Sequence, residues 1–528
     1  MSNQQGINRR IFLGSTGIGF TGAVVSALMT NNIASAKNNK VLKLSKEENV
    51  NPCDVKVNVK TVFGAYIHSG VWEGPCRFGP SALLTTPEQE RARFRNSFKR
   101  VVENDKKRFG TDVNFLDPVY YEYTEELNGS FTVGDDDIAD DLFQKLENDK
   151  VDLYLIHGNT FGQYFHAIVG RSVKKPTIGI GGLLSESTAY LRSIGLEAYV
   201  VKNDDELNKL IQILRARKVF QQTNILYFTN RGRKLKRNSS VISDYEDLKE
   251  RFGIVAQIAT YKVLSDEMNR VKKSKDTMEK VEDFADRLIK NARAVHIDRK
   301  YVINSIEYHF AVKNLLKKYN SNATVIECRE FCASKLPEKW KIVPCLTNSI
   351  LNSEGLPAGC EGDMNAMLAM RVLMSLSKKA AMMGNLGARG ENIVAFGHDV
   401  STMKMNGFDK PGFDKPDIPY ELRNFVHSGW GTKIQVDLTK IKEKTATLAR
   451  FDPLAKRILV TKGEVYDLIG FGKSGCALNL LINVPGSRQL VDKKYDYGPH
   501  FAMVYGDYTQ ELIKLGEMLK VEVEYHNL

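Results

Sequence analysis

Short apolar segments alternate with amphipathic helical segments over the first half of the chain, and this alternation restricts the possible folds more than any other feature. Strand-like runs lie at residues 57–63, 151–157, 176–181, 197–201, 224–228 and 253–259. Helical runs lie between them at residues 87–107, 136–148, 204–217 and 245–252. Strands separated by helices pair in parallel, and ligands bind at the carboxyl ends of such strands. The sequence therefore predicts an α/β fold with parallel sheets.

The pattern changes after about residue 381. Two long helical patterns, at residues 262–293 and 297–318, precede the change, and strand-like runs punctuated by Gly, Pro and Asp follow it. Such runs predict an all-β domain, and a helical pattern at residues 508–520 ends the chain. At roughly 150 residues per domain, a chain of 528 residues holds about three domains. We expect a Rossmann-like N-terminal domain (53–175), a Rossmann-like middle domain (176–380) and a β-barrel C-terminal domain (381–528).

The N-terminal segment has the pattern of an export signal. Arg9 and Arg10 precede a mildly apolar stretch rich in Gly and Ala, and the small residues at 34–36 provide a cleavage site. This arrangement resembles a twin-arginine signal peptide over residues 1–36, whereas its many small and polar residues suit a membrane anchor poorly. Since no other stretch has the apolar length of a membrane span, the sequence predicts an exported, periplasmic protein with no stable membrane span after signal removal.

Composition argues against some partners and against a disulfide framework. The formal charge of +12 is modest, and the basic run at residues 231–237 lacks the interleaved aromatic residues of a nucleic-acid-binding module, so no nucleic-acid partner is expected. Seven cysteines are few for this length. Cys328 and Cys332 lie four residues apart, but no second Cys or His pair follows at zinc-site spacing. Apolar packing is the expected role of most cysteines.

Two carboxylates stand at the start of a predicted helix, behind a turn rich in Gly and Pro. Apolar residues from Met364 to Leu376 follow helical spacing, so the helix is expected to begin near Asp363, which suits an N-cap. Glu361 lies just outside the helix, where the helix dipole favours its ionised form. An anionic oxygen there can bind a metal or accept a proton, although two solvated carboxylates at a helix start would give the same pattern.

Two histidines stand at the ends of predicted strands. His398 ends the run at residues 393–397, and His500 lies between a turn and a strand. A single one among nine scattered histidines is usually a satisfied surface or core residue. Together with Glu361, however, these two supply carboxylate and imidazole ligands suited to a divalent metal such as Mn²⁺.

A glycine-rich motif at residues 470–475 matches a dinucleotide-binding pattern by its letters alone. That motif requires a helix after the glycines, whereas residues 476–484 form a predicted strand. A phosphate loop requires Gly where Asp467 stands. The motif is therefore interpreted as a glycine-rich hairpin.

Several C-terminal motifs together resemble the L-fucose isomerase and L-arabinose isomerase superfamily. They are residues 360–363 (Cys-Glu-Gly-Asp), 384–385 (Gly-Asn), 397–398 (Gly-His), 445–450, 475–476, and the ending from His500 through residues 506–507, 515–520 and 525–527. These specific matches lie within residues 345–528. The resemblance implies two Rossmann-like domains followed by a β-barrel, an oligomeric assembly, and Mn²⁺-dependent interconversion of aldoses and ketoses.

The resemblance also implies roles for single residues. Glu361 matches the first metal-binding carboxylate and catalytic base. His500 matches the C-terminal metal ligand, and His398 matches an additional metal histidine of the arabinose branch. Asn385 stands where the second acidic ligand of the family belongs. Its amide oxygen can bind a metal, but it cannot transfer a proton and it lacks a negative charge.

The departure at Asn385 keeps three functions open. The first is isomerisation of an aldose and a ketose through a metal-stabilised enediolate, in which Glu361 takes the proton next to the carbonyl. The second is an exported sugar-binding protein with altered catalysis, and the third is a metal-dependent epimerase or lyase. Asp399 and Glu391 are the acids that could replace the missing ligand.

The sequence does not identify the sugar. The candidate sugar contacts at loop-like positions are His68, Trp72, His157, Gln163 and Trp430, and a structural or exposed role suits each of them equally well. A homo-oligomer is expected, because neighbouring subunits commonly complete such sites in the family.

Overall fold

The computed structural model describes residues 54–67, 85–123, 140–158, 162–180, 184–231 and 245–526. The predicted signal peptide lies outside the described residues. Among the helices described, none combines the length and the apolar composition that a membrane crossing requires. The secondary structure is mixed, with parallel sheets and an antiparallel one, so the predicted α/β class is confirmed.

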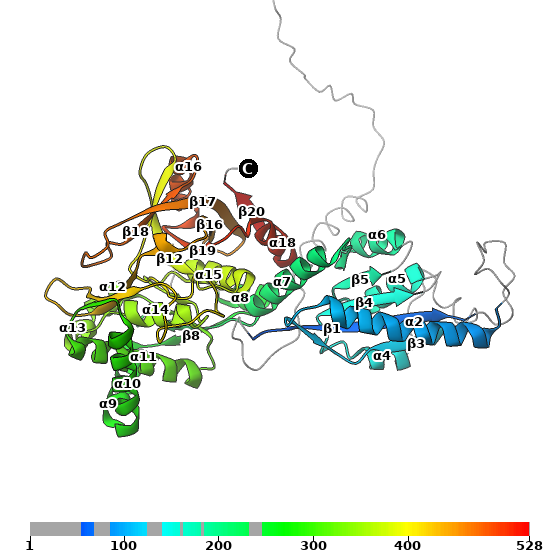
Figure 1. Ribbon diagram of the computed structural model, residues 1–528, viewed down its shortest axis with the longest axis horizontal. Coiled ribbons are helices and arrows are strands. Elements are labelled where there is room, and N and C mark those ends of the chain that lie inside the picture. The colour runs from blue at the N-terminus through cyan, green and yellow to red at the C-terminus, as the bar shows by residue number, and fades with distance from the viewer. Residues whose placement is uncertain are drawn as a thin grey trace, which may run out of the picture. The chain divides into compact units, whose positions relative to one another are not determined.

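The first sheet is parallel and is built from the N-terminal part of the chain (Figure 1). Its strand order is β2-β1-β4-β5-β6, and β3 also pairs with β1. The strands are β1 (Val57–Tyr66), β2 (Val113–Phe115), β3 (Val119–Tyr123), β4 (Leu153–Gly158), β5 (Thr177–Ile180) and β6 (Ala198–Tyr199). The helices between them are α2 (Pro87–Arg108), α4 (Asp140–Leu146), α5 (Gly162–Val173) and α6 (Ser185–Ser193).

The second sheet is also parallel, with the strand order β11-β10-β7-β8. Its strands are β7 (Asn224–Phe228), β8 (Val255–Ala259), β10 (Ala323–Ile326) and β11 (Ala358–Gly359). The accompanying helices are α7 (Asp204–Gln221), α8 (Tyr245–Phe252), α11 (Arg299–Lys318), α12 (Cys328–Ala333), α13 (Leu336–Trp340), α14 (Cys345–Ser353) and α15 (Met364–Ser377). Since β8 and β10 lie on opposite sides of β7, the strand order reverses there, and such a reversal is where parallel sheets bind ligands.

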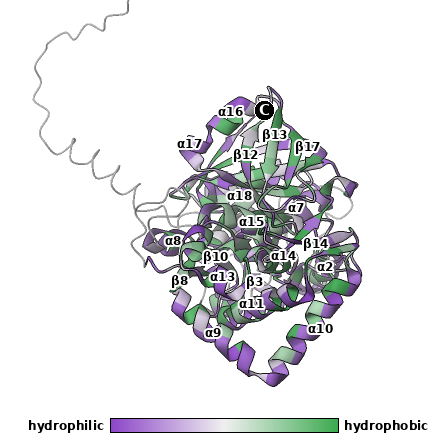
Figure 2. Ribbon diagram, turned by 90° about the vertical axis from the view of Figure 1, so that its left-hand side faces the viewer, coloured by the Kyte–Doolittle hydropathy of each residue, from purple (hydrophilic) through white to green (hydrophobic). Residues whose placement is uncertain are grey.

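One predicted helix is divided in the structure. Residues 262–293 were expected to form a single helix, but α9 (Tyr261–Lys273) ends before Ser274 and α10 (Lys275–Asn291) begins after it. The Ser274 hydroxyl accepts a hydrogen bond from the Thr277 amide at 3.3 Å, which caps α10. Both helices lie at the edge of the molecule in Figure 2 and carry many hydrophilic residues.

The C-terminal part of the chain forms a sheet whose six antiparallel strands close on themselves, and β20 adds to β17 in parallel. The order is β16-β19-β12-β13-β18-β17-β20, and β16 also pairs with β17, so six strands form a ring. The strands are β12 (Met382–Ala388), β13 (Ile393–Gly397), β16 (Thr445–Phe451), β17 (Arg457–Ile469), β18 (Asn479–Asn483), β19 (His500–Tyr505) and β20 (Glu522–Tyr525). The helices here are α16 (Ser487–Asp492), α17 (Lys494–Tyr497) and α18 (Thr509–Leu519).

A small fourth sheet joins the middle and C-terminal parts of the sequence. It has the order β15-β14-β9 and consists of β9 (Ala294–His296), β14 (Tyr420–Asn424) and β15 (Thr432–Val436), followed by the short 3-10 helix η3 (Leu438–Lys440). The glycine motif connects the antiparallel strands β17 and β18, which confirms the predicted hairpin. The division into three domains stays a prediction.

Helix α15 holds the predicted site against the rest of the fold. Every residue from Met364 to Leu376 is buried, and the helix packs on α7, β16 and β19. Burial of each Leu or Met side chain contributes about 1.5–3 kcal/mol, so this helix is firmly fixed. The closed sheet and the parallel sheet therefore meet at its N-terminal end.

Candidate metal centre

The turn between β11 and α15 places Glu361 in an unusual backbone conformation. Glu361 has φ 53° and Gly362 has φ 70°, so both residues are left-handed. A Cβ atom on Gly362 would lie 2.5 Å from Glu327 Oε2 and 2.8 Å from the Tyr227 hydroxyl, so only glycine fits. A left-handed residue other than glycine costs about 1–3 kcal/mol, and such strain clusters at functional sites.

Glu361 faces two buried histidines from the closed sheet. Glu361 Oε1 lies 3.4 Å from His398 Nε2, and Oε2 lies 3.7 Å from His500 Nε2. The three residues can offer ligand atoms that all lie within 4.8 Å of one another. Both Nε2 atoms are buried without a hydrogen-bond partner. Because an unpaired buried polar atom is costly, this carboxylate and two imidazoles fit a divalent cation as their common partner.

A carboxylate holds the ring of His500 from behind. Asp363 Oδ2 lies 2.8 Å from His500 Nδ1, and Asp363 Oδ1 accepts a hydrogen bond from the Ala366 amide at 2.9 Å, which confirms the predicted N-cap. The buried Arg450 donates to Asp363 Oδ2 at 2.7 Å and to the carbonyl oxygens of His500 and Tyr497. A carboxylate on the far nitrogen fixes the orientation of a metal-binding imidazole and raises its basicity.

His398 is held differently. Its Nδ1 lies 3.6 Å from the Cys476 sulfur. The next residue, Asp399, is fully buried, and its carboxylate accepts hydrogen bonds from Lys433 Nζ at 2.9 Å, Gln435 Nε2 at 2.8 Å and the Ala477 amide at 2.8 Å. Both Asp399 oxygens are therefore occupied. Its carboxylate fixes the backbone beside His398 and is not free to replace a missing metal ligand.

Neighbouring groups shift the pKa values of His398, Glu361 and Asp363. Burial lowers the pKa of His398, but the Cys476 sulfur and the Glu361 carboxylate outweigh it and raise this pKa to about 10. The His398 imidazole in turn lowers the pKa of Glu361, against burial. Burial raises the pKa of Asp363, but Arg450 and His500 hold it below its ordinary value. At neutral pH the two carboxylates are ionised and His398 holds a proton that a metal ion would displace.

Asn385 stands beside this triad on the neighbouring strand. It lies in β12 in register with His500 on β19 and with Gly397 on β13. Met383 is two residues earlier on the same face, and its sulfur accepts a hydrogen bond from the Cys360 amide at 3.0 Å. The exposed Asn385 is therefore on the face of β12 that meets the Glu361 turn.

The predicted sugar contacts lie in several places. His157 is buried in β4, where Nε2 lies 2.9 Å from Oδ2 of Asp105 on α2, so its contact is between the first sheet and a helix that covers it. Trp430 lies in the connection between β14 and β15, with the Lys341 ammonium 5.1 Å from its ring centre. Gln163 belongs to the first turn of α5. His68 and Trp72 lie outside the described residues. Among the acids, Glu391 is exposed.

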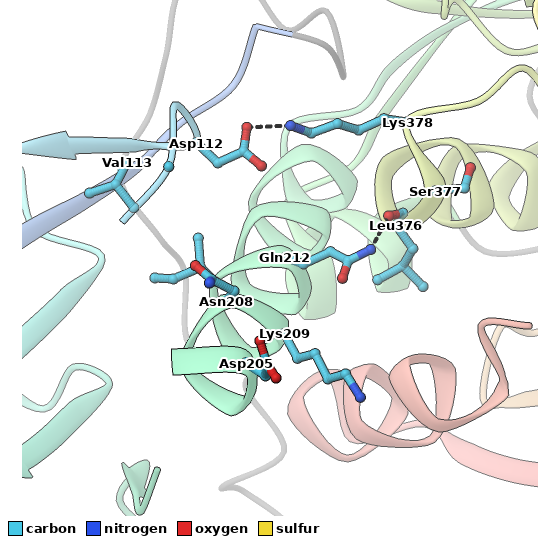
Figure 3. Close-up of a pocket in the computed structure, with 11 residues that line it drawn as sticks. Asp112, Val113, Asp205, Asn208, Lys209, Gln212, Leu376, Ser377 and Lys378 are labelled. Atoms are coloured by element: carbon cyan, nitrogen blue, oxygen red, sulfur yellow. Dashed lines mark hydrogen bonds and ion pairs between the residues drawn. The ribbon is translucent and has the colours of Figure 1, made fainter. Parts of the chain in front are cut away.

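A cavity of about 590 Å³ lies away from the triad, between α7 and the C-terminal end of α15 (Figure 3). Two of its polar side chains are already engaged: Lys378 pairs with Asp112, and Gln212 donates to the Leu376 carbonyl. Of the predicted site residues that the structure describes, none lines it. The unpaired imidazole nitrogens, and not this cavity, identify the candidate centre.

Sequence reasoning missed the residues that support the triad. Arg450 was noted only as the end of a family motif, and Lys433 and Cys476 were given no role at the site. The available signal for Lys433 was weak: a lysine directly before the strand-like run that begins at Ile434, which the structure buries completely. Asp363 was predicted as a helix cap, but its second oxygen serves His500.

Comparison with known proteins gives a partial match. No protein-family model matches the chain. The chain is 28% identical over 187 residues to a sulfoquinovose isomerase of Priestia aryabhattai and, equally, to one of Priestia megaterium (strain ATCC 12872 / QMB1551). The aligned region covers 35% of this chain and 40% of each relative. The chain thus matches less than half of the length of these curated relatives, and a relationship to sugar isomerases is what the comparison supports.

Proposed function

We propose that this protein is a metal-dependent aldose-ketose isomerase. The observation that carries the proposal is the convergence of Glu361, His398 and His500 with two buried and unpaired imidazole nitrogens. The partial match to two sulfoquinovose isomerases supports the same class of reaction. Mn²⁺ is the ion we propose, because the resemblance to the L-fucose and L-arabinose isomerases implies it and because carboxylate oxygens are among its preferred ligands.

The chemistry assigned to the residues follows from their positions. Glu361, His398 and His500 would hold the metal, which would supply a positive charge for polarising the oxygens of the sugar. Glu361 is ionised and takes the proton from the carbon next to the carbonyl, then returns it to the neighbouring carbon. His398 and His500 hold the centre, while Asp363 and Arg450 keep the His500 ring in place. Asn385 offers a neutral amide oxygen from β12.

The proposed substrate is a sugar with an anionic substituent, such as sulfoquinovose, the sugar named in both relatives. Arg329 supports this choice, because its side chain is 67% exposed and contributes to lowering the pKa of Glu361. A guanidinium at the rim of the site can bind a sulfonate, carboxylate or phosphate group. Arg329→Gln is expected to raise KM for an anionic sugar and to leave KM for a neutral sugar unchanged.

A second candidate function is an exported sugar-binding protein without efficient turnover. The exposed amide of Asn385, in place of an acid, favours it, because one compensating negative charge is missing beside the metal. Export and homo-oligomeric assembly belong to this proposal as well as to the first. A metal-dependent epimerase or lyase would share the proton abstraction at Glu361 and differ in its product.

The test is an assay of the full chain with Mn²⁺ on a panel of sugars, followed by NMR of the products. The panel contains sulfoquinovose, a pentose and a 6-deoxyhexose. An isomerase converts one of them to its ketose, and Glu361→Gln lowers kcat by about 10²–10⁴, whereas the exposed control Glu391→Gln does not. Sugar binding without any product would support the second function, and a different product would identify an epimerase or lyase.

A further inference from the structure

Two cysteines contact one another directly behind the proposed metal ligand Glu361. Cys328 begins α12 after β10, and Cys360 follows β11, the neighbouring strand. Their sulfur atoms lie 3.5 Å apart. Cys360 is 2% exposed, whereas Cys328 is partly exposed, so the pair lies nearer to solvent on the side of Cys328.

The same sulfur atoms are tied to the backbone that carries Glu361. The Glu361 amide donates a hydrogen bond to Cys328 Sγ at 3.4 Å, and Asn348 Nδ2 donates to Cys360 Sγ at 3.5 Å. The Cys360 amide donates to Met383 Sδ at 3.0 Å. Cys360 is also the residue directly before Glu361, whose φ of 53° leaves the turn little freedom to adjust.

We propose that Cys328 and Cys360 form a reversible disulfide that displaces Glu361 and weakens metal binding. The oxidant is a peroxide: the Cys328 thiolate attacks one peroxide oxygen, the O–O bond breaks, and Cys328 becomes a sulfenic acid while hydroxide leaves. The Cys360 thiol then attacks the Cys328 sulfur and releases water. Both sulfurs are oxidised to the disulfide, and one peroxide is reduced to water.

The bond requires a movement at the metal centre. A disulfide has an S–S distance of about 2.05 Å, so the two sulfurs must approach each other from 3.5 Å. This movement breaks the hydrogen bond from the Glu361 amide to Cys328 and pulls on the residue next to Glu361. The carboxylate then no longer faces His398 and His500 in its original position. Cys332, exposed and on the same helix, has no such tie and is the matched control.

The test treats the full-length protein with hydrogen peroxide and follows two readouts. Peptide mapping without reduction identifies cross-linked cysteines, and titration calorimetry measures the affinity for Mn²⁺ alone. We expect a 328–360 cross-link and an affinity for Mn²⁺ weaker by about tenfold or more, as when a partner that orients a metal ligand is lost. Dithiothreitol restores the affinity. Cys332→Ser behaves as the wild type, and Cys328→Ser neither cross-links nor loses affinity.

Three results would overturn the proposal. They are the absence of a 328–360 cross-link in the wild type, a cross-link that leaves Mn²⁺ affinity unchanged, and an equal loss of affinity in Cys328→Ser. The peptide map needs no variant, so it decides the first point even if a variant fails to fold. The effect on metal rests on the proposed function, but the disulfide does not. A reduced protein that binds no Mn²⁺ refutes the metal centre and the coupling, whereas a missing cross-link refutes the disulfide alone.

Discussion

Buried histidines occur around the first parallel sheet and in the proposed metal centre, and their ring nitrogens are used differently. Around the first sheet, Nε2 of His157 on β4 lies 2.9 Å from Asp105 on α2, and both ring nitrogens of His166 on α5 contact hydroxyl groups, those of Ser187 and Thr177. In the metal centre, the Nδ1 atoms of His398 and His500 have partners, but their Nε2 atoms have none. A histidine beside a carboxylate is therefore not by itself a sign of a site.

An unpaired nitrogen alone is not sufficient either. His309 Nδ1 is also buried without a hydrogen-bond partner, but its ring packs against the rings of Phe284 and Phe310. Burial lowers the pKa of His309 to about 3, so this imidazole is neutral. What distinguishes the metal centre is that two unpaired nitrogens converge on one ionised carboxylate.

The largest expected effect separates the histidines of the two regions. His398→Gln or His500→Gln removes an imidazole ligand, and we expect Mn²⁺ affinity to fall by more than about 100-fold, because losing even an orienting partner costs 10–100-fold. His157→Gln disturbs only the Asp105 contact and leaves Mn²⁺ affinity unchanged. Titration calorimetry checks both. Equal losses in the two regions would remove the distinction between them.

The next effect distinguishes Asp363, the carboxylate behind His500, from Asp105, the carboxylate beside His157. Asp363→Asn keeps an acceptor for the helix cap but leaves Arg450 without its ion pair, so we expect about 3–5 kcal/mol lower stability and 10–100-fold weaker Mn²⁺ binding. Asp105 contacts Thr61 and His157, so Asp105→Asn is expected to lower stability by about 1–3 kcal/mol. It does not change metal affinity. Urea unfolding and Mn²⁺ titration measure the two quantities. A metal effect in Asp105→Asn would contradict this account.

The pH dependence of metal binding follows from His398. Its pKa of about 10 means that the metal-free protein holds a proton there at pH 7. Binding of Mn²⁺ releases that proton, so the apparent affinity rises about tenfold per pH unit up to about pH 10. Calorimetry in buffers of different ionisation enthalpy counts the released proton. An affinity that does not change between pH 6.5 and 8.5 would show that His398 is neutral or not a ligand.

The pKa shifts of His398 and His166 predict opposite dependences of stability on pH in the two regions. The pKa of His398 is raised from 6.5, so its stabilisation of the metal-free protein is complete below about pH 6.5 and is lost as pH rises through about 10. Burial lowers the pKa of His166 to about 4, so its stabilisation is present above about pH 6.5 and is lost as pH falls through about 4. Unfolding of His398→Gln and His166→Gln at pH 5 and pH 9 distinguishes them. If both variants showed one trend, the contrast would be wrong.

The smallest expected effect comes from Asn385. Asn385→Asp adds a negative charge on the face of β12 that meets the Glu361 turn, so Mn²⁺ affinity is expected to rise about three- to tenfold. Glu391→Gln is an exposed control with no expected change. Mn²⁺ titration of both variants measures the effect. If Asn385→Asp binds metal as the wild type does, Asn385 lies outside the reach of the ion.

The fold was predictable where local patterns decide it. The strand at 224–228 and the helix at 245–252 have the expected bounds, since apolar runs and spacing define them. The break at Ser274 was missed, because the helical pattern continues on both sides and a single serine cap divides it. The sequence also placed His398 and His500 at strand ends and Glu361 at a helix start, and the structure brings these three side chains together, while their role as metal ligands stays a prediction.

The supporting contacts were not predictable, because they join distant parts of the chain. Arg450 meets Asp363 across 87 residues, and Lys433 meets Asp399 across 34. Neither pair leaves a periodic pattern, since each depends on how helix α15 and the hairpin loop pack on the closed sheet. The pair Cys328 and Cys360 is similar: the spacing pointed to Cys332 as the neighbour of Cys328, but parallel strands bring Cys360 to it.

The most direct test of the metal centre is anomalous diffraction from crystals of the protein soaked in Mn²⁺, collected at the manganese edge. The account predicts one strong peak within coordination distance of a Glu361 carboxylate oxygen and of Nε2 of both His398 and His500, and no such peak in crystals of Glu361→Gln. A well-ordered Mn²⁺-soaked crystal with no peak between these three side chains would contradict it.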